Sequence, residues 1–255
     1  MEPAAARLEL LALSGVPLVR PGDDLAPIVL QALRLSGRSL EPGDVLVVAQ
    51  KIVSKSEDRY VELAAVEPSP KAMELAEATG KDPALLEVIL RESRDVVRVR
   101  NDVLIVEHRL GFVLANAGVD ASNVGEQGRV LLLPADPDAS CHALREKLRG
   151  ATGTDVGVVI NDSWGRAWRL GTIGTALGVS GLPALVDLRG VPDLFGRALR
   201  STEVAVADEL AAAASLIMGQ AGEGHPLVLA RGFPYPGREG RGADLLRPRS
   251  LDLFR

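Results

Sequence analysis

The sequence has a single cysteine, Cys141, among 255 residues. One cysteine excludes an intrachain disulfide and any zinc site built from several cysteine thiolates. The three histidines, His108, His142 and His225, do not have the spacing of a metal-binding motif. Each histidine is expected to be structural or exposed, and a catalytic triad centred on histidine is not expected.

Long hydrophobic runs and an excess of positive charge are absent too. No stretch reaches the ~18 uninterrupted apolar residues of a membrane helix. The apolar segment 8–18 is interrupted by Glu9, and no cationic region of a signal peptide precedes it. The formal net charge of −5 at pH 7 disfavours non-specific nucleic-acid binding, which requires clustered positive charge. The cytoplasm is the expected location, with neither a nucleic-acid nor a membrane partner.

The familiar phosphate-binding motifs are missing. The sequence contains no G-x-x-x-x-G-K-[ST] loop, and the spaced glycines of residues 164–190 do not form a G-x-G-x-x-G fingerprint. Lysine is scarce as well, since only five of the 29 basic residues are lysines. Two of them, Lys51 and Lys55, follow an apolar run at 45–48, where their ammonium groups suit phosphate oxygens. The alternative is that they only solvate the end of a strand.

Two apolar segments each lead into a short polar sequence with one aspartate. Residues 112–114 precede Asp120, and residues 156–160 precede Asp162 and Ser163. Two carboxylates at the ends of buried strands suit Mg²⁺ or Mn²⁺, especially where a phosphate supplies further ligands. The alternative for either segment is that its polar residues only shape a turn or cap a helix.

The hydrophobic pattern predicts interspersed helices and strands, and the composition, 47% hydrophobic and 25% charged, is ordinary for a folded protein. Helices are expected from about residue 24 to residue 36 and at 68–79, 82–89, 136–149 and 203–218, the last capped by Thr202. Strands are expected near 8–19 and at 45–48, 96–99, 103–106, 112–115, 130–133, 156–160 and 227–230. The Pro-, Gly- and Arg-rich segment 233–255 is predicted to be poorly ordered or draped over the surface.

A glycine-containing loop is predicted at 218–225, between the last long helix and the last strand. Its three glycines would let backbone N–H groups approach an anion. A plain connection between helix and strand is the alternative, because a single glycine-rich loop is a weak signal.

Taken together and in order, these motifs resemble the coenzyme F420:L-glutamate ligase family. The matching segments are Ser14-Gly15-Val16-Pro17-Leu18, Pro21-Gly22-Asp23-Asp24, Ala49–Lys55 with Glu57, Asn116-Ala117-Gly118-Val119-Asp120-Ala121-Ser122-Asn123, Asn161-Asp162-Ser163 with Gly165-Arg166, and Met218–Gly224. They extend over about residues 8–232, and the block 116–123 is the most specific. The resemblance implies an α+β fold of two interleaved subdomains, with mixed sheets and flanking helices, in residues 1–232, followed by the tail 233–255.

The resemblance also implies roles for individual residues. Those implied to bind GTP are Ser14, Gly15, Val16, Pro17, Gln50, Lys51, Lys55, Asn123, Met218, Gly219, Gln220, Ala221, Gly222, Glu223, Gly224 and His225. Asp120 and Asp162 are implied to be catalytic and to hold divalent metal, with Ser163 and Gln220 assisting a second ion. Gln220 matches a position that can be Glu, and its neutral amide is the weakest of these ligands. The implied ions are Mg²⁺ or Mn²⁺, and K⁺ is a further candidate.

The implied activity is the GTP-dependent joining of L-glutamate to F420-0, the deazaflavin precursor of the coenzyme. GTP would phosphorylate the terminal carboxylate, and the α-amine of glutamate would displace phosphate from the acyl phosphate. Further rounds would add γ-linked glutamates, and the enzyme is expected to be a homodimer. Two alternatives stay open: another nucleotide-dependent carboxylate–amine ligase on the same scaffold, and a non-catalytic protein that binds nucleotide or deazaflavin.

Overall fold

A five-stranded mixed sheet is the largest element of the protein. The structure is a computed structural model and describes residues 6–125, 127–234 and 239–252. The sheet has the order β1 (Glu9–Ala12), β12 (Leu227–Arg231), β2 (Val45–Ala49), β8 (Gly157–Arg166) and β9 (Arg169–Ser180). β2 and β8 run parallel, whereas the other neighbouring pairs are antiparallel. This sheet and its helices confirm the predicted α+β class.

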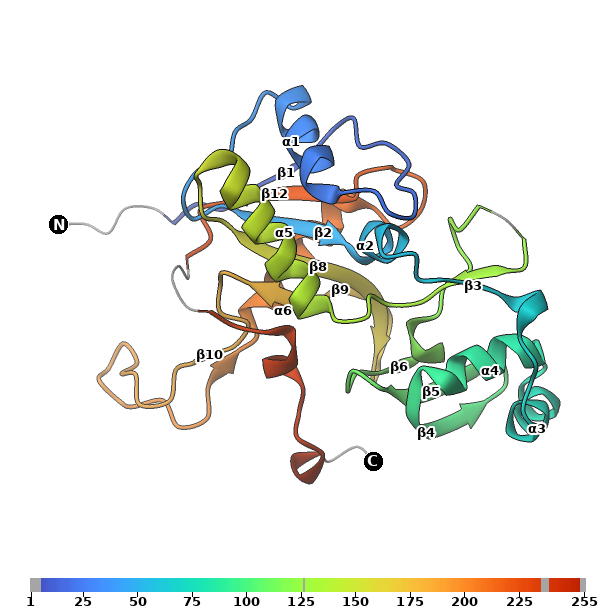
Figure 1. The fold of residues 1–255 in the computed structure, drawn as a ribbon. Coiled ribbons are helices and arrows are strands. Elements are labelled where there is room, and N and C mark those ends of the chain that lie inside the picture. The colour runs from blue at the N-terminus through green and yellow to red at the C-terminus, as the bar shows by residue number, and fades with distance from the viewer. Residues whose placement is uncertain (1–5, 126, 235–238, 253–255) are drawn as a thin grey trace.

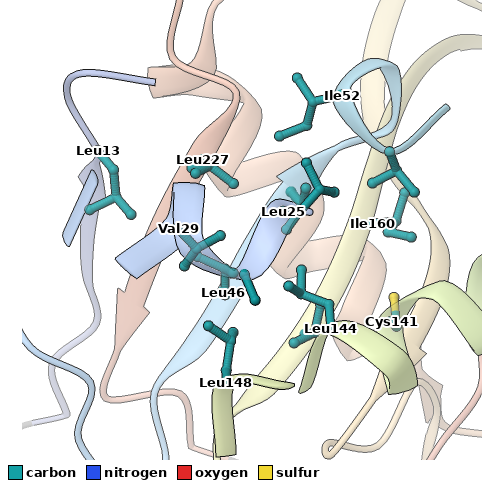
Figure 2. Close-up of a cluster of buried hydrophobic side chains, with 14 of the residues drawn as sticks. Leu13, Leu25, Val29, Leu46, Ile52, Cys141, Leu144, Leu148, Ile160 and Leu227 are labelled. Atoms are coloured by element: carbon teal, nitrogen blue, oxygen red, sulfur yellow. The ribbon is translucent and has the colours of Figure 1, made fainter. Parts of the chain in front are cut away.

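Helices cover both faces of the main sheet (Figure 1). The helices are α1 (Leu25–Leu35) and α5 (Pro137–Thr152) on one face and α6 (Val206–Met218) on the other. Because side chains alternate along a strand, Leu46 and Val48 of β2 pack with α1 and α5, whereas Val45 and Val47 pack with α6. Figure 2 shows the first of these clusters, in which the buried Cys141 of α5 also lies.

A smaller unit lies between β2 and β8 in the sequence and beside the main sheet in space (Figure 1). It contains α3 (Pro70–Thr79), α4 (Pro83–Arg91) and the meander β4 (Ser93–Arg100), β5 (Val103–His108) and β6 (Val113–Ala115), with β3 (Tyr60–Glu62) and β7 (Arg129–Leu131) pairing at its junction with the main sheet. Its core is separate and includes Leu86, Ile89, Leu104 and Val106. The chain thus leaves the main sheet after β2 and returns to it at β8, which is the predicted interleaving.

Local signals in the sequence fix several helix ends. The Asp24 carboxylate accepts from Ala26 N and caps α1. Ser69 caps α3, whose first residue is Pro70, and Gly80 ends it with a φ of 70°. These boundaries agree with the prediction. The short 3₁₀ turns are Leu63–Ala65, Asn116–Gly118, Gly242–Leu245 and Arg249–Leu251.

Two predicted boundaries are wrong. The alanine-rich helix α6 begins at Val206, and Thr202 does not cap it, because residues 203–204 form β11 (Glu203–Val204), which pairs with β10 (Val186–Asp187). The strand predicted at 156–160 continues as β8 to Arg166, because β9 pairs with it along this length. Asp162 and Ser163 therefore lie inside a strand and not in a loop behind it.

The C-terminal segment 239–252 packs against the main body, so of the two predicted states, poorly ordered or draped over the surface, these residues adopt the second. Gly242 N donates to Asp138 Oδ1 of α5 at 2.7 Å, and a side chain at Gly242 would collide with the backbone of Leu177. The Glu239 carboxylate accepts from Ser180 Oγ and Arg145 Nη1 at 3.0 and 2.8 Å. Backbone approach and ion pairing of this kind leave no hydrophobic pattern in the sequence.

Among the described residues, no helix combines the length with the apolar character that a membrane crossing requires.

The packing of this segment gives a stability prediction. Removing residues 239–255 should cost about 3 kcal/mol, because it breaks the charged contacts of Asp138 and Arg145 and exposes the apolar core beneath Leu246. That loss should lower the melting temperature by about 6–12 °C in calorimetry. Leu251→Ala, at a side chain that is 60% exposed, is the control and should shift it by less than about 2 °C. If the truncated protein had the same melting temperature as the full chain, the segment would contribute little to stability.

Candidate functional site

Most of the residues to which the sequence assigns a role meet at one edge of the main sheet. Leu13 N donates to Leu227 O at 2.9 Å, so the turn after β1 lies beside the loop that precedes β12. Ala49 N donates to Pro226 O at 2.8 Å, and Ala49 also pairs with Asn161 of β8. The turn Ser14–Pro17, the end of β2, the loop 218–225 and Asp162 are therefore neighbours.

The two lysines after β2 lie on a short helix, α2 (Gln50–Ser56). Lys51 and Lys55 are four residues apart and so share one face of it. Lys51 Nζ lies 2.8 Å from Asp120 Oδ2 and donates to Ser122 Oγ at 2.6 Å. Lys55 Nζ donates to the carbonyl oxygen of Asn123 at 2.8 Å. Both lysines thus hold the segment 120–123 against the sheet edge.

The charges of this cluster perturb one another. Burial lowers the pKa of Lys55, the neighbouring charge of Lys51 lowers it further, and Asp120 partly offsets this. For Asp120, burial raises the pKa, but hydrogen bonds from Lys51 and from Ser122 N outweigh burial and bring the pKa below its usual value. The cluster therefore contains two crowded ammonium groups, which an added anion would stabilise.

An unusual backbone conformation leads into Asp120. Asn116 and Ala117 both have a φ of 53°, in the left-handed region that non-glycine residues rarely adopt. Asp120 itself is fixed by a two-way backbone bridge, in which Asp120 N donates to Leu131 O at 3.0 Å and Leu131 N donates to Asp120 O at 2.8 Å. Such strain persists only where the surroundings impose it, and it is common at functional sites.

Asp162 is half-buried in β8, and no ion pair to it is found in the described part of the chain. Its Oδ1 accepts from Ser163 N at 2.8 Å. Burial and, secondarily, the charge of Asp120 raise the pKa of Asp162 to about 6, although the Ser163 N–H and Lys51 act in the opposite direction. A half-buried carboxylate beside a second carboxylate is a donor set that fits a hard cation such as Mg²⁺ or Mn²⁺.

The described residues contain no group of three His, Cys, Asp or Glu side chains arranged to hold a metal ion. An ion between Asp120 and Asp162 would therefore complete its coordination with hydroxyl, amide, water or substrate oxygens. Ser163 is half-buried next to Asp162, and Gln220 is exposed in the loop that follows α6.

The loop from Met218 to His225 reaches the same cluster. Asn123 Nδ2 donates to Ala221 O at 3.5 Å. The Glu223 carboxylate folds back on its own loop and accepts a hydrogen bond from Ala221 N at 2.8 Å. This bond is the largest of the effects that lower the pKa of Glu223. The Ala221 N–H is thus bonded to the loop's own carboxylate, and binding of an external anion by this loop stays a prediction.

Two of the predicted residues already make hydrogen bonds within the protein. Gln50 is only 3% exposed, and its Nε2 donates to Ser54 Oγ and Leu132 O at 2.5 and 3.4 Å. Ser14 N donates at 3.0 Å to Oγ of Ser36, the residue that directly follows α1.

Sequence reasoning assigned no role to Ser122 or Asn161. Ser122 bridges Lys51 and Asp120, because its hydroxyl accepts from the first and its N–H donates to the second. Its position two residues after an aspartate is typical of an Asx turn, which was the available signal. Asn161 is buried and faces α6, and no sequence pattern shows that contact.

A cavity of about 920 Å³ lies away from this cluster, between α5, β9 and the C-terminal segment. Arg145, which lines it, already pairs with Asp155 and Glu239, each at 2.8 Å. The lining of this cavity includes none of the residues to which the sequence assigns a role.

Comparison with known proteins gives a consistent picture. Residues 15–232 match the family model described as F420-0:Gamma-glutamyl ligase. The coenzyme F420:L-glutamate ligase of Methanothermobacter thermautotrophicus is 49% identical, over 97% of this chain and 99% of its own length. The proteins of the same name from Methanopyrus kandleri and Archaeoglobus fulgidus are 50% and 42% identical, over 97% and 98% of this chain and 99% and 97% of their own lengths.

The raised pKa of Asp162 gives a prediction for the metal-free protein. Because folding favours the protonated carboxyl, the stability that Asp162 contributes is fully present below its unfolded pKa of about 3.8 and is lost as the pH rises through about 6. Asp162→Asn cannot ionise, so thermal melts in chelator should find the variant more stable than the wild type at pH 8 but not at pH 3.5.

Added Mn²⁺ should reverse this order of stability at pH 8. The ion should stabilise the wild type, whereas the variant lacks the Asp162 carboxylate as a ligand. The exposed Asp102→Asn removes the same charge from a turn and serves as the control for net charge. Equal stabilisation of wild type and Asp162→Asn by Mn²⁺ would show that Asp162 is not a metal ligand.

Proposed function

Because the chain belongs to the F420-0:gamma-glutamyl ligase family, we propose that it joins L-glutamate to the coenzyme F420 precursor F420-0 in a reaction driven by GTP. The observation that carries this proposal is the meeting of two lysines, two carboxylates and a glycine-containing loop at one edge of the main sheet. Each belongs to a segment within the matched residues 15–232.

Joining a carboxylate to an amine in water requires activation of the carboxylate. In the proposed reaction the terminal carboxylate of F420-0 attacks the γ-phosphorus of GTP, and GDP leaves. The α-amine of glutamate then attacks the carbonyl carbon of the acyl phosphate, inorganic phosphate leaves, and the amine loses a proton. Repetition at the new γ-carboxylate extends the chain with γ-linked glutamates.

The site offers positioning and charge for this chemistry, which is what phosphoryl transfer chiefly requires. Lys51 and Lys55 present two ammonium groups to the phosphates, and Lys51 exchanges its present contact with Asp120 for one with nucleotide. The residues assigned to the nucleotide are Ser14–Pro17, Gln50, Asn123 and the loop Met218–His225. In this assignment Gln50 acts from the interior, where it supports α2.

Asp120 and Asp162 are the residues that would hold Mg²⁺ or Mn²⁺, with Ser163 and Gln220 contributing neutral oxygens. When bound, such an ion neutralises the charge that develops on the transferred phosphoryl group. Ser163 N donates to Asp162 Oδ1 and Ser122 N donates to Asp120 Oδ1, so backbone N–H groups orient both carboxylates even when Lys51 turns to the nucleotide.

The proposal is tested with purified protein, GTP, Mn²⁺, L-glutamate and F420-0. GDP release that depends on glutamate, together with a product heavier by one glutamyl unit, is the expected result. Asp162→Asn should reduce the single-turnover rate by about a thousandfold, or ~4 kcal/mol in the barrier, because a charged ligand is lost. Asp102→Asn should leave the rate unchanged. Turnover with ATP or another acceptor acid would indicate a different ligase, and nucleotide binding without turnover a carrier protein.

We also propose that the protein is a homodimer that uses the arm between β10 and β11. This segment projects from the main body (Figure 1), and near its tip Leu194 and Phe195 are 99% and 88% exposed. Leu170, near the start of β9, is 99% exposed as well. Exposed apolar side chains on a projecting arm are typical of subunit interfaces.

Replacement of both Leu194 and Phe195 by Asp should convert the dimer to a monomer in sedimentation velocity, because burying two charges at an interface is costly. Leu216→Asp, at a residue of α6 that is 85% exposed, is the matched control and should remain dimeric. A wild type that sediments as a monomer at micromolar concentration would refute the dimer, and a dimeric arm variant would refute this interface.

A further inference from the structure

A buried polar contact ties the strand that carries Asp162 to the helix that precedes the glycine-containing loop. Asn161 is only 5% exposed. Its Nδ2 donates to Ser215 Oγ at 3.0 Å and to Met218 Sδ at 3.4 Å. Met218 is the last residue of α6, and the loop begins at Gly219. A buried amide costs free energy that an apolar residue would not, so its presence here requires an explanation.

The pleat of β8 gives Asn161 and Asp162 opposite directions. Ile160 packs in the cluster with α1 and α5, and Val159 packs in the cluster with α6. By alternation, Asn161 faces α6 while Asp162 faces the side of Lys51 and Asp120. A bulge also lies here, since Ile160 pairs with Gly178 but Asn161 pairs with Ala176. Bulges commonly re-aim side chains beside functional sites.

The approach of α6 to β9 is unusually close at this point. A side chain at Gly174, which pairs with Ser163, would collide with Ser215 Oγ, with the carbonyl oxygen of Ala211 and with Asn161 Oδ1. Asn161 Oδ1 is itself buried and has no hydrogen-bond partner in the described part of the chain. The absence of a side chain at Gly174 thus leaves the space in which Asn161 contacts the end of α6.

The loop after α6 is restrained at both ends. At its far end, Pro226 O accepts from Ala49 N at 2.8 Å, next to the helix with Lys51 and Lys55. At its near end, Gly219 N donates to Ser215 O at 3.3 Å, and Asn161 holds Ser215 and Met218. The Asn161 contact is therefore a polar link between the near end of the loop and β8.

We propose that Asn161 is a positioning residue, which fixes the start of the loop 219–225 relative to Asp162 and Ser163. Through this contact, the loop and Asp162, whose side chain lies on the opposite face of β8, move as one unit. The inference rests on the proposed function only in so far as loop and carboxylates act on the same nucleotide. The restraint on the loop itself is a property of the protein without ligand.

Hydrogen–deuterium exchange of the unliganded protein tests the restraint directly. In Asn161→Ala, amides of 219–225 should exchange about fivefold to tenfold faster, the factor that corresponds to loss of one neutral hydrogen bond. Exchange in α4 and in β12 should stay unchanged. Ser215→Ala removes only the acceptor, so it should fold normally and show a smaller increase in the same amides.

Thr79→Val is the matched control, because it deletes another buried hydrogen bond, from Thr79 Oγ1 to Leu75 O at 2.7 Å, in the smaller unit. It should accelerate exchange near α3 and leave 219–225 unchanged. The proposal is overturned if exchange of 219–225 is unchanged in both Asn161→Ala and Ser215→Ala, or if it rises equally throughout the molecule, which would indicate a purely structural residue.

Kinetics provide the second readout. Asn161→Ala should raise the KM for GTP about fivefold to tenfold and change kcat by less than about twofold, because a restraint on the loop affects ground state and transition state alike. A fall in kcat with an unchanged KM would overturn the positioning role. If the wild type shows no ligase activity, the proposed function fails, and the exchange comparison still decides the inference.

Discussion

The parallel pairing of β2 with β8 determines where the chemistry of this protein is located. With Ala49 opposite Asn161, the polar continuations of both strands emerge at the same edge of the sheet. A parallel pair cannot be joined by a tight turn, so a long connection between the two strands is obligatory. That connection contains the smaller unit and α5, and on its way back it delivers Asp120 to Lys51.

Much of the scaffold was predictable because its signals are local. The apolar run of β2, the Asp24 and Ser69 caps and the glycine after α3 each act within a few residues. The extension of β8 to Arg166 was not predictable in this way, because its outer half is polar and is held by backbone pairing with β9. The same holds for Gly242, whose place depends on the distant Asp138 and Leu177.

The candidate site shows a similar division. Motif order brought Asp120, Asp162 and the two lysines into one hypothesis, and the structure places them together. It was the tertiary arrangement that revealed the ion pair of Lys51 with Asp120, the interior position of Gln50 and the raised pKa of Asp162. Each of these depends on distance and burial, which one sequence does not encode in any local pattern. Asn161 was overlooked for the same reason.

The position of β12 in the sheet has a consequence for folding of the nascent chain on the ribosome. β12 lies between β1 and β2, although it is synthesised almost 180 residues after β2, which ends at Ala49. Until residues 227–231 have emerged, β1 and β2 each expose an unpaired edge that can join the edge of another nascent chain. The main sheet therefore cannot be completed until β12 has been synthesised. A chaperone that covers these strand edges during that interval would prevent pairing between nascent chains.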